Sequence, residues 1–270
     1  MTSWIRFRTA ADRTGFGTLQ GDTVAEYSGD MFDAPQPTRT TLAAGALTLL
    51  APCAPSKIIA LWNNFHALAA KLGKPPATHP LYLLKPGTSV IGTQQLIERP
   101  RHYTGKIAFE GELGIVIGRR CRDVAASDSG DYIFGYTCVN DVTAIGVMNE
   151  NPDFTQWCRA KGYDTFGCLG PGILTQLDWR AASVVTRLDG VERQRYPLSD
   201  MIFSPAELVS LISRDMSLLP GDVIACGTSL GVGSIADGAS VEVTIDGIGS
   251  LANSLGPATV DAGRQRELKR

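Results

Sequence analysis

Residues 107–118, with the sequence IAFEGELGIVIG, form the most strand-like run in the chain. Side chains alternate between the two faces of a strand. Glu110 and Glu112 therefore share one face, while Phe109 and Leu113 share the other. The two carboxylates would lie about 7 Å apart along the strand and repel each other. Because the rest of the run is apolar, the strand is difficult to expose to water, and buried carboxylates need a counter-charge.

A third carboxylate, Asp141, follows the apolar run that begins near Phe134. Polar residues where a strand meets a loop often carry function. Three carboxylates without a histidine or a thiol favour Mg²⁺ or Mn²⁺, with Ca²⁺ also allowed, over zinc. The competing interpretation is that Glu110 and Glu112 are solvated side chains on an exposed edge strand. Spacing alone leaves both interpretations open.

The composition excludes several classes of protein. The chain has 270 residues, of which 44% are hydrophobic and 19% charged, and its formal net charge is −2. This balance is ordinary for a globular protein and argues against a nucleic-acid partner. No apolar run reaches membrane-spanning length, and Met1–Arg6 lacks the layout of a signal peptide. The six cysteines contain no C-x-x-C pair. We therefore expect a cytoplasmic protein with reduced thiols and no membrane partner.

Strand-like runs recur along the chain and helices are few, which predicts an α+β fold with a largely antiparallel or mixed sheet. We divide the chain into a small N-terminal β-rich domain at residues 1–52, a catalytic domain at 53–258 and a polar C-terminal tail at 259–270. The proline-containing stretch 34–38 is interpreted as a loop or linker. Further strands are predicted over residues 57–62, 81–84, 134–139, 223–226 and 241–245.

Two short helices are predicted from their start signals. The asparagines at 63–64 would cap a helix over residues 65–72, which a glycine and two prolines stop. The segment Ser204–Glu207 has a capping-box pattern with proline at the first helical position. The second helix should therefore begin there and end near Ser213.

Two further segments offer groups for an anionic ligand. Lys161 would add positive charge beside a metal site, which suits a carboxylate or enolate oxygen, and Asp164 could pair with Lys161 or with Arg159. The turn at Gly227-Thr228-Ser229 would present backbone N–H groups and the Thr228 hydroxyl to an anion. The same turn belongs to a G-x-S-x-G pattern, so a serine hydrolase that uses Ser229 is an alternative. However, all three histidines precede this serine, and no helical pattern follows it.

The histidines offer one candidate for proton transfer. His66 lies near the start of the first predicted helix, where it is either a general base or a surface group. His79 and His102 lie in loop-like sequence. Neither has the i,i+4 partner that a helical metal site would use.

Several motifs occur together in a fixed order over roughly residues 57–255. They are Leu84-Lys85-Pro86, Glu110-Gly111-Glu112-Leu113, Gly135-Tyr136, Asn140-Asp141-Val142-Thr143-Ala144, Lys161 with Asp164, Leu169-Gly170-Pro171, Pro220-Gly221-Asp222-Val223-Ile224 and Gly227-Thr228. In this ordered set the chain resembles the fumarylacetoacetate hydrolase family. The resemblance implies a mixed β-roll fold, here with the small N-terminal β-rich domain, and usually a homodimer.

The resemblance also implies roles for individual residues. Mg²⁺ or Mn²⁺ would be held by Glu110, Glu112 and Asp141. Catalysis would use Lys161 and His66, and substrate binding would use Lys161, Thr228, Gly227, Asp164 and Lys85. Substrates of the family are small 2-oxo or β-diketo acids and their enols. Its reactions include C–C hydrolysis, decarboxylation and isomerisation of 2-hydroxy-dienoates in aromatic catabolism.

One departure from the family pattern affects the expected reaction. Many members carry a histidine and, three residues later, a glutamate in the helix after the first strand of the catalytic domain. Leu68 and Lys71 stand at these positions here, and His66 has no acidic partner. This favours isomerisation, which needs only enolate stabilisation and proton movement, over hydrolytic C–C cleavage. The alternatives are a decarboxylase or tautomerase of an oxaloacetate-like acid and a non-catalytic, metal-dependent binder of 2-oxo acids.

Overall fold

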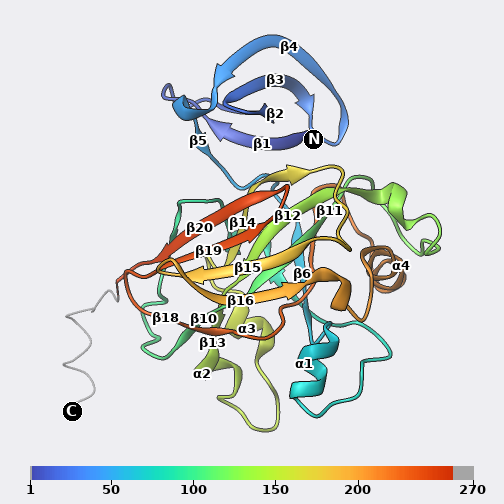
Figure 1. Ribbon diagram of the computed structural model, residues 1–270, viewed down its shortest axis with the longest axis vertical. Helices are drawn as coiled ribbons and strands as arrows, with labels where there is room; N and C mark the ends of the chain where they lie inside the picture. Colours follow the sequence, from blue (N-terminus) through green and yellow to red (C-terminus); the bar gives the residue numbers. More distant parts are fainter. Residues whose placement is uncertain (1, 258–270) are drawn as a thin grey trace.

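The structure is a computed structural model that describes residues 2–257. The predicted C-terminal tail at 259–270 lies outside the described residues. Figure 1 shows a small β-rich lobe, formed by the first five strands, beside a larger body built of sheets with a few short helices at its periphery. The protein is therefore α+β with mixed sheets, as the sequence predicts.

Twelve strands form the largest sheet. They are β1 (Ser3–Arg8), β2 (Thr14–Gln20), β3 (Thr23–Asp30), β4 (Asp33–Ala43), β5 (Thr48–Leu49), β6 (Lys57–Trp62), β7 (Leu81–Pro86), β8 (Val90–Ile91), β11 (Gly111–Ile117), β12 (Ile133–Asp141), β14 (Gly167–Leu174) and β17 (Val223–Ala225). Their order is β4-β3-β2-β1-β14-β12-β11-β17-β6-β7, with β5 beside β1 and β8 beside β14. Pairs β14–β8 and β17–β6 are parallel and the others antiparallel, so the sheet is mixed.

Two smaller sheets complete the body. The first contains β9 (Leu96–Ile97), β15 (Ser183–Leu188), β16 (Val191–Pro197), β19 (Ser240–Ile245) and β20 (Gly249–Leu255), in the order β16-β15-β19-β20-β9. The second contains β10 (Ile107–Phe109), β13 (Thr143–Ala144) and β18 (Gly233–Ile235), in the order β13-β10-β18. The five-stranded sheet covers the central strands of the large sheet. Leu113 and Ile115 of β11 share one buried cluster with Val184, Val243 and Leu251.

The N-terminal strands continue the large sheet, because β1 pairs with β14 through Ser3 and Trp4. They also have a small core of their own around Phe7. The expectation that residues 34–38 form a loop or linker is wrong, because they lie within β4 and pair with β3. Strand β4 is an edge strand with shifts in register, and prolines are tolerated at such edges because no neighbouring strand needs their missing N–H.

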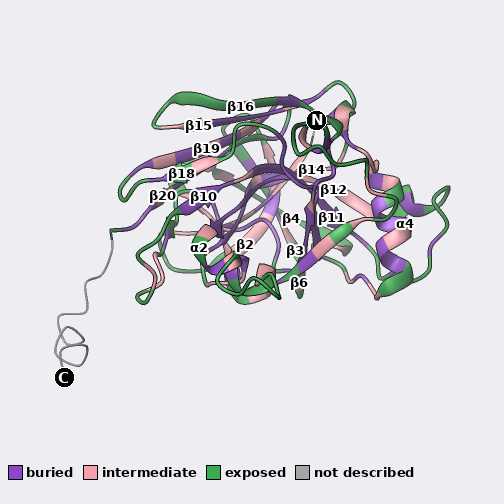
Figure 2. Ribbon diagram, turned by 90° about the horizontal axis from the view of Figure 1, so that it is seen from below, coloured by how far each residue is buried: buried purple, intermediate pink, exposed green. Residues whose placement is uncertain are grey.

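Four α-helices are present in residues 2–257, and none is long and apolar enough to cross a membrane. They are α1 (His66–Lys71), α2 (Ile145–Met148), α3 (Trp157–Lys161) and α4 (Pro205–Asp215). The prediction for α4 is confirmed, and Ser204 and Glu207 form its capping box. Figure 2 shows that α4 has both buried and exposed stretches.

Helix α1 is also confirmed, but the prediction of its cap is wrong. The N-cap is Phe65, and it makes no side-chain cap. The side chain of Asn64 instead accepts a hydrogen bond from Phe203 N and donates to Cys226 O, both 2.9 Å away. The side chain of Asn64 therefore makes tertiary hydrogen bonds instead of the helix cap that the local pattern predicts.

Candidate metal centre and ligand cavity

Three carboxylates from separate backbone positions meet at the centre of the large sheet. Glu110 lies between β10 and β11, Glu112 is the second residue of β11, and Asp141 is the last residue of β12. One oxygen from each lies within 4.8 Å of the others. Strand β11 is flanked by β12 and β17, and Glu112 is fully buried. The interpretation of solvated glutamates on an edge strand is therefore wrong.

The predicted strand over 107–118 is interrupted at Glu110. The backbone N–H of Glu110 donates to Asn140 Oδ1 at 3.0 Å, and its carbonyl accepts from Asp141 N at 2.9 Å. The interruption separates β10 from β11. It leaves the side chain of Glu110 17% exposed, whereas that of Asp141 is 1% exposed.

Gly111, between the two glutamates, leaves no room for a side chain. A Cβ atom there would collide with Thr186 Oγ1. The backbone N–H of Gly111 donates to Gln194 Oε1 at 3.1 Å. Its carbonyl accepts from Tyr196 Oη at 2.5 Å and Thr228 Oγ1 at 3.0 Å. The backbone between the two glutamates is therefore fixed by hydrogen bonds to β16 and to the turn at 227–228.

Two buried lysines face the carboxylates. Lys161 Nζ lies 2.9 Å from Glu110 Oε1 and 2.6 Å from Asp141 Oδ2. Lys85 Nζ contacts Asp141 Oδ1 and donates to Phe166 O at 2.8 Å. Burial alone would lower the pKa of Lys161, but the surrounding carboxylates outweigh burial and raise it. Burial alone would raise the pKa of Asp141, and the two ammonium groups lower it instead. Asp141 is thus held ionised between two cations.

Glu112 has an oxygen without a partner. Its Oε2 accepts from Gly227 N at 2.8 Å, but Oε1 has no hydrogen-bond partner among the described residues. Burial, and then repulsion from Asp141 and Glu110, raise the pKa of Glu112. An ionised Oε1 would need a cation, and a protonated one would need an acceptor.

The three carboxylates suit a cation. When Glu112 is ionised, they carry one more charge than the two ammonium groups that face them, and a bound cation would balance it. The donor set is composed of carboxylate oxygens, which suits a hard divalent ion such as Mg²⁺ or Mn²⁺. The residues present therefore fit the metal that the sequence predicts.

A cavity of about 400 Å³ opens over this centre. It is lined by Trp62, Leu68, Lys71, Leu72, Ala108, Glu110, Thr143, Ile145, Met148, Trp157, Thr228, Ser229, Leu230, Gly231 and Val232. Of the three carboxylates only Glu110 lines the cavity, so Glu112 and Asp141 lie behind its floor. The rest of the lining is mostly apolar, which is usual for a small-molecule site.

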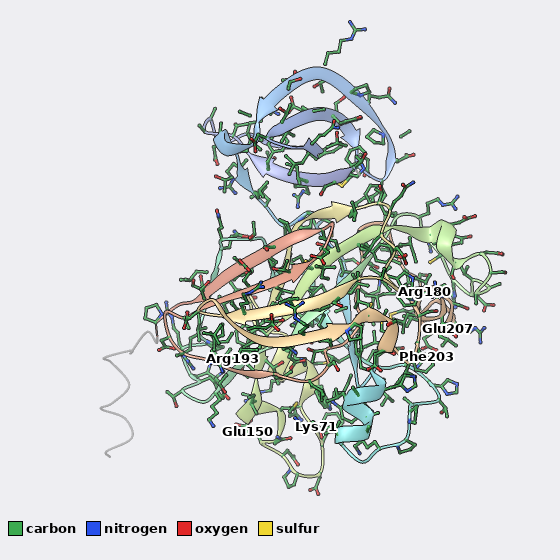
Figure 3. All side chains as sticks on the ribbon, in the orientation of Figure 1. Lys71, Glu150, Arg180, Arg193, Phe203 and Glu207 are labelled. Atoms are coloured by element: carbon green, nitrogen blue, oxygen red, sulfur yellow. The ribbon has the colours of Figure 1, made fainter. Side chains whose placement is uncertain are left out.

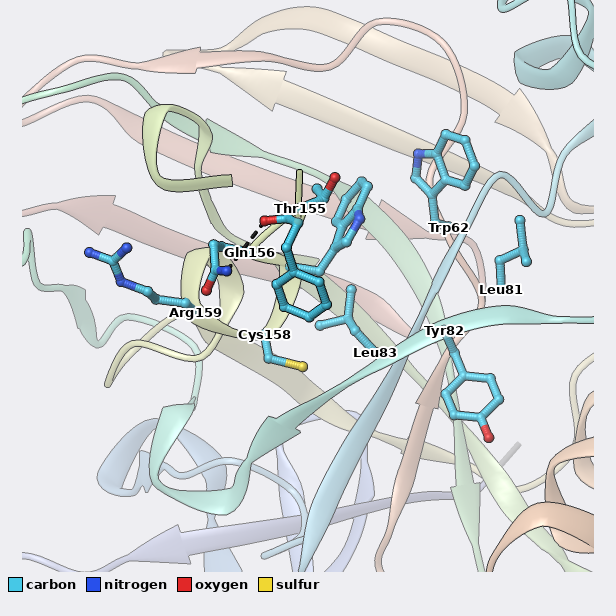
Figure 4. Close-up of a pocket in the computed structure, with 10 residues that line it drawn as sticks. Trp62, Leu81, Tyr82, Leu83, Thr155, Gln156, Cys158 and Arg159 are labelled. Atoms are coloured by element: carbon cyan, nitrogen blue, oxygen red, sulfur yellow. Dashed lines mark hydrogen bonds between the residues drawn. The ribbon is translucent and has the colours of Figure 1, made fainter. Parts of the chain in front are cut away.

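A second cavity, of about 540 Å³, lies next to the first. The two share Trp62 and Trp157, whose ring centroids are 5.8 Å apart. Figure 4 shows the second cavity between β7 and the segment before α3, with Trp62 at its rim. None of the three carboxylates lines it. Of these two cavities, only the first therefore reaches the carboxylate cluster.

The glycine-rich turn supports the floor through most of its polar groups. Thr228 lines the cavity, but its hydroxyl already donates to Gly111 O and accepts from Gln194 Nε2 at 2.9 Å. Gly227 N donates to Glu112. A Cβ at Gly227, whose φ is +89°, would lie 3.3 Å from Leu61 O, so glycine suits this position.

The serine of the G-x-S-x-G pattern has no base. Ser229 Oγ is buried and has no hydrogen-bond partner in the described part of the chain. His66, His79 and His102 are all exposed, and none contacts it. A serine nucleophile requires a base within hydrogen-bond reach, so the geometry gives no support to the serine hydrolase alternative.

Three other predicted site residues do not line the cavity. His66 is exposed on α1, and Lys85 is buried behind Asp141. Asp164 is exposed and forms no ion pair within residues 2–257. The expected pairing of Asp164 with Lys161 or Arg159 is wrong, because Lys161 is engaged by Glu110 and Asp141, and Arg159 pairs with Glu150.

Sequence reasoning missed three supporting residues. Thr143 Oγ1 donates to Glu110 Oε1 at 2.8 Å, and Gln194 and Tyr196 hold Gly111. A signal for the last two was present. In β16, Gln194 and Tyr196 are buried while Arg193 and Arg195 are exposed, which is the alternation of a half-buried strand.

Comparison with known proteins places this site in a family. Residues 57–256 match the fumarylacetoacetate (FAA) hydrolase C-terminal family, and residues 3–52 match the Rv2993c-like N-terminal family. The structure of 2-hydroxyhepta-2,4-diene-1,7-dioate isomerase from Mycobacterium marinum superposes with a TM-score of 0.86 at 36% identity, covering 95% of this chain and 98% of that one.

Two further proteins inform the chemistry. Oxaloacetate tautomerase YisK of Bacillus subtilis is 34% identical over 215 residues, which are 75% of this chain and 70% of that protein. The structure of maleylpyruvate hydrolase from Sphingobium sp. SYK-6, in complex with manganese (II) and pyruvate, has a TM-score of 0.76 at 26% identity and covers 96% of this chain and 100% of that one. The chain therefore belongs to the fumarylacetoacetate hydrolase family.

Proposed function

We propose that the protein is a divalent-metal-dependent enzyme that isomerises or tautomerises a small 2-oxo or β-diketo acid, or its enol. The observation that carries the proposal is the convergence of Glu110, Glu112 and Asp141 around the unpartnered Glu112 Oε1, under a cavity with a mostly apolar lining. The enolate of a 2-oxo acid has oxygens on two neighbouring carbons, which a divalent ion at such a centre could bind together. The apolar walls limit the access of water.

Each residue of the floor has a role in this proposal. Mg²⁺ or Mn²⁺ held by the three carboxylates would supply the Lewis acid that lowers the cost of forming an enolate. Lys161 keeps a positive charge beside Glu110 and Asp141, where it favours an anionic oxygen. Lys85 fixes Asp141, and Thr143 orients Glu110.

The relatives support the reaction class. One is named as an isomerase of a 2-hydroxy-diene-dioate, one as an oxaloacetate tautomerase, and one was solved with manganese and pyruvate. The first two names describe keto–enol chemistry, whereas the third protein, maleylpyruvate hydrolase, is named for hydrolysis. What favours keto–enol chemistry for this chain is the absence of a histidine from the described residues that line the cavity. The second candidate is decarboxylation of an oxaloacetate-like acid, and C–C cleavage in aromatic catabolism is the third. A homodimer and a cytoplasmic location remain predictions.

A substrate panel with Mn²⁺ tests the proposal. The protein is incubated with 2-oxo and β-diketo acids while the enol absorbance and the products are followed. We expect a metal-dependent change in enol absorbance that excess chelator abolishes and added Mn²⁺ or Mg²⁺ restores. Full activity in excess chelator would overturn the proposal. Metal-dependent binding of oxalate or pyruvate without turnover of any acid would instead support the non-catalytic binder.

A serine variant separates the remaining alternative. Ser229→Ala should leave turnover within a few-fold of wild type, because its hydroxyl has no base. Near-total loss of turnover would favour the serine hydrolase.

A further inference from the structure

Lys71 is the one cationic side chain among the described residues that line the cavity over the carboxylates. It is the last residue of α1 and is exposed. No ion pair or hydrogen bond joins its side chain to any other residue between 2 and 257. Figure 3 shows Lys71 on α1, at the lower side of the body and away from the sheets. Its charge is therefore free to meet a ligand.

The cavity is polar at its floor and mostly apolar along its walls. Its floor carries Glu110 and the hydroxyl of Thr143, while the walls are aromatic and aliphatic. Three of its apolar residues are also exposed to solvent, which places them at the mouth: Leu72 at 44%, Leu230 at 39% and Val232 at 42%. Leu72 directly follows Lys71 in the chain. The ammonium group thus belongs to the mouth, across an apolar stretch from the floor.

The size of the cavity exceeds the needs of a chelating head group. A volume of about 400 Å³ lies within the range of cavities that hold whole small-molecule ligands, roughly 300–1,000 Å³. A ligand whose 2-oxo acid head sits on the floor has room for a tail that crosses the apolar walls. The tail would end beside the mouth, where the charge is positive.

We propose that Lys71 is a specificity-determining residue that binds a second carboxylate at the far end of the substrate. The preferred substrates are then 2-oxo dicarboxylic acids with an apolar spacer, bound with one end at the carboxylate floor and the other at Lys71. This inference rests on the proposed function, because the head of the substrate must lie on Glu110, Glu112 and Asp141.

A second lysine provides a matched control. Lys74 lies three residues further along the chain, with its Nζ 5.8 Å from the centroid of the Trp62 ring. It lines a different cavity, together with Pro75, Pro76 and His79. Removal of its charge therefore tests whether any lysine of this segment would give the same result.

The test compares 2-oxoadipate with 2-oxohexanoate, which has the same carbon chain but ends in a methyl group. Exchange of the C3 hydrogens for deuterium, followed by proton NMR with Mn²⁺ present, measures enolisation of each acid. In Lys71→Met, the preference for the diacid in kcat/KM should fall about tenfold, equivalent to about 1.4 kcal/mol. This fall should come from a higher KM for the diacid, while kcat and KM for the monoacid stay unchanged. Lys71→Arg should keep most of the preference, and Lys74→Met all of it.

The other outcomes overturn the inference in distinguishable ways. An unchanged preference in Lys71→Met, or an equal loss with Lys74→Met, removes the proposed role of Lys71 and leaves the metal-dependent function intact. An equal fall in kcat for both acids would place Lys71 at the reacting centre instead. If wild type catalyses no Mn²⁺-dependent exchange with either acid, the proposed function fails, and this inference fails with it.

Discussion

The floor and the mouth of the cavity are built in opposite ways. At the floor, Asp141 is held between Lys85 and Lys161, and all three side chains are almost fully buried. Asp141 and Glu112 lie on the central strands of the large sheet. At the mouth, Leu72 and Leu230 are about as exposed as many surface side chains, and they belong to the end of a short helix and to a turn.

The difference separates chemistry from ligand choice. A change at the floor leaves a buried charge or a buried polar group without its partner, which costs stability as well as activity. A change at the mouth removes few contacts within the protein, so its effect should fall on the ligand alone. The contrast predicts that the cost in stability falls from the floor to the mouth.

The largest effect is expected at Asp141. Asp141→Asn removes the charge that both Lys85 and Lys161 contact, and breaking a buried ion pair in this way costs about 3–5 kcal/mol. Urea unfolding measures the loss. The control is Glu192→Gln, which removes an exposed pair with Arg195 at 2.7 Å and should lower stability far less, because solvent screens an exposed pair. Equal losses in the two variants would remove the contrast between buried and exposed charges.

A smaller effect is expected at Gln194, which joins the floor to the glycine-rich turn. Gln194→Leu leaves Gly111 N without its acceptor and Thr228 Oγ1 without one donor, at a cost of about 1–3 kcal/mol. Gly111 lies between Glu110 and Glu112 in the chain, so a shift of its backbone should move both carboxylates. The affinity for Mn²⁺, measured by calorimetry, should therefore fall as well. Gln36→Leu, at an exposed glutamine of β4, should change neither. Unaltered metal affinity in Gln194→Leu would show that the floor does not depend on β16.

The smallest effect on stability is expected at the mouth. Leu72→Ser should change the free energy of unfolding by no more than about 0.5 kcal/mol, as for most surface substitutions. It should raise KM about fivefold for substrates with an apolar spacer, if about 1 kcal/mol of apolar contact with the ligand is lost. Leu84→Ser changes another exposed leucine, on β7 outside the cavity, and should leave KM alone. A large loss of stability in Leu72→Ser would show that the mouth contributes to folding stability as the floor does, and would remove the contrast.

The features that the sequence predicted are local or periodic. Two-residue spacing on an apolar run indicated that Glu110 and Glu112 lie together, and the burial of Glu112 follows from the apolar residues around it. The capping box at Ser204 and Glu207 acts within four residues, so it formed as expected. The position of Asp141 after an apolar run offered it as a third carboxylate, and the ordered motifs identified the family, which supported the same set.

The features that the sequence did not predict depend on contacts between distant segments. Asn64 bonds to Phe203 and Cys226 rather than capping α1, because the fold brings those groups next to it. The strand stops at Glu110 because Asn140, on the neighbouring strand, accepts the hydrogen bond from its backbone N–H. Gln194 was overlooked because a buried glutamine in a charged strand carries no motif. Its function is visible only beside Gly111.

Binding of Mn²⁺ is the sharpest test of the proposed metal centre. Isothermal titration calorimetry compares the wild type with Glu112→Gln, in which an amide replaces the carboxylate that has the unpartnered oxygen. We expect one Mn²⁺ per chain in the wild type and binding lost in Glu112→Gln, with the circular dichroism spectrum unchanged. Equal Mn²⁺ affinity in the two proteins, or no binding to the wild type, would contradict the proposed metal centre.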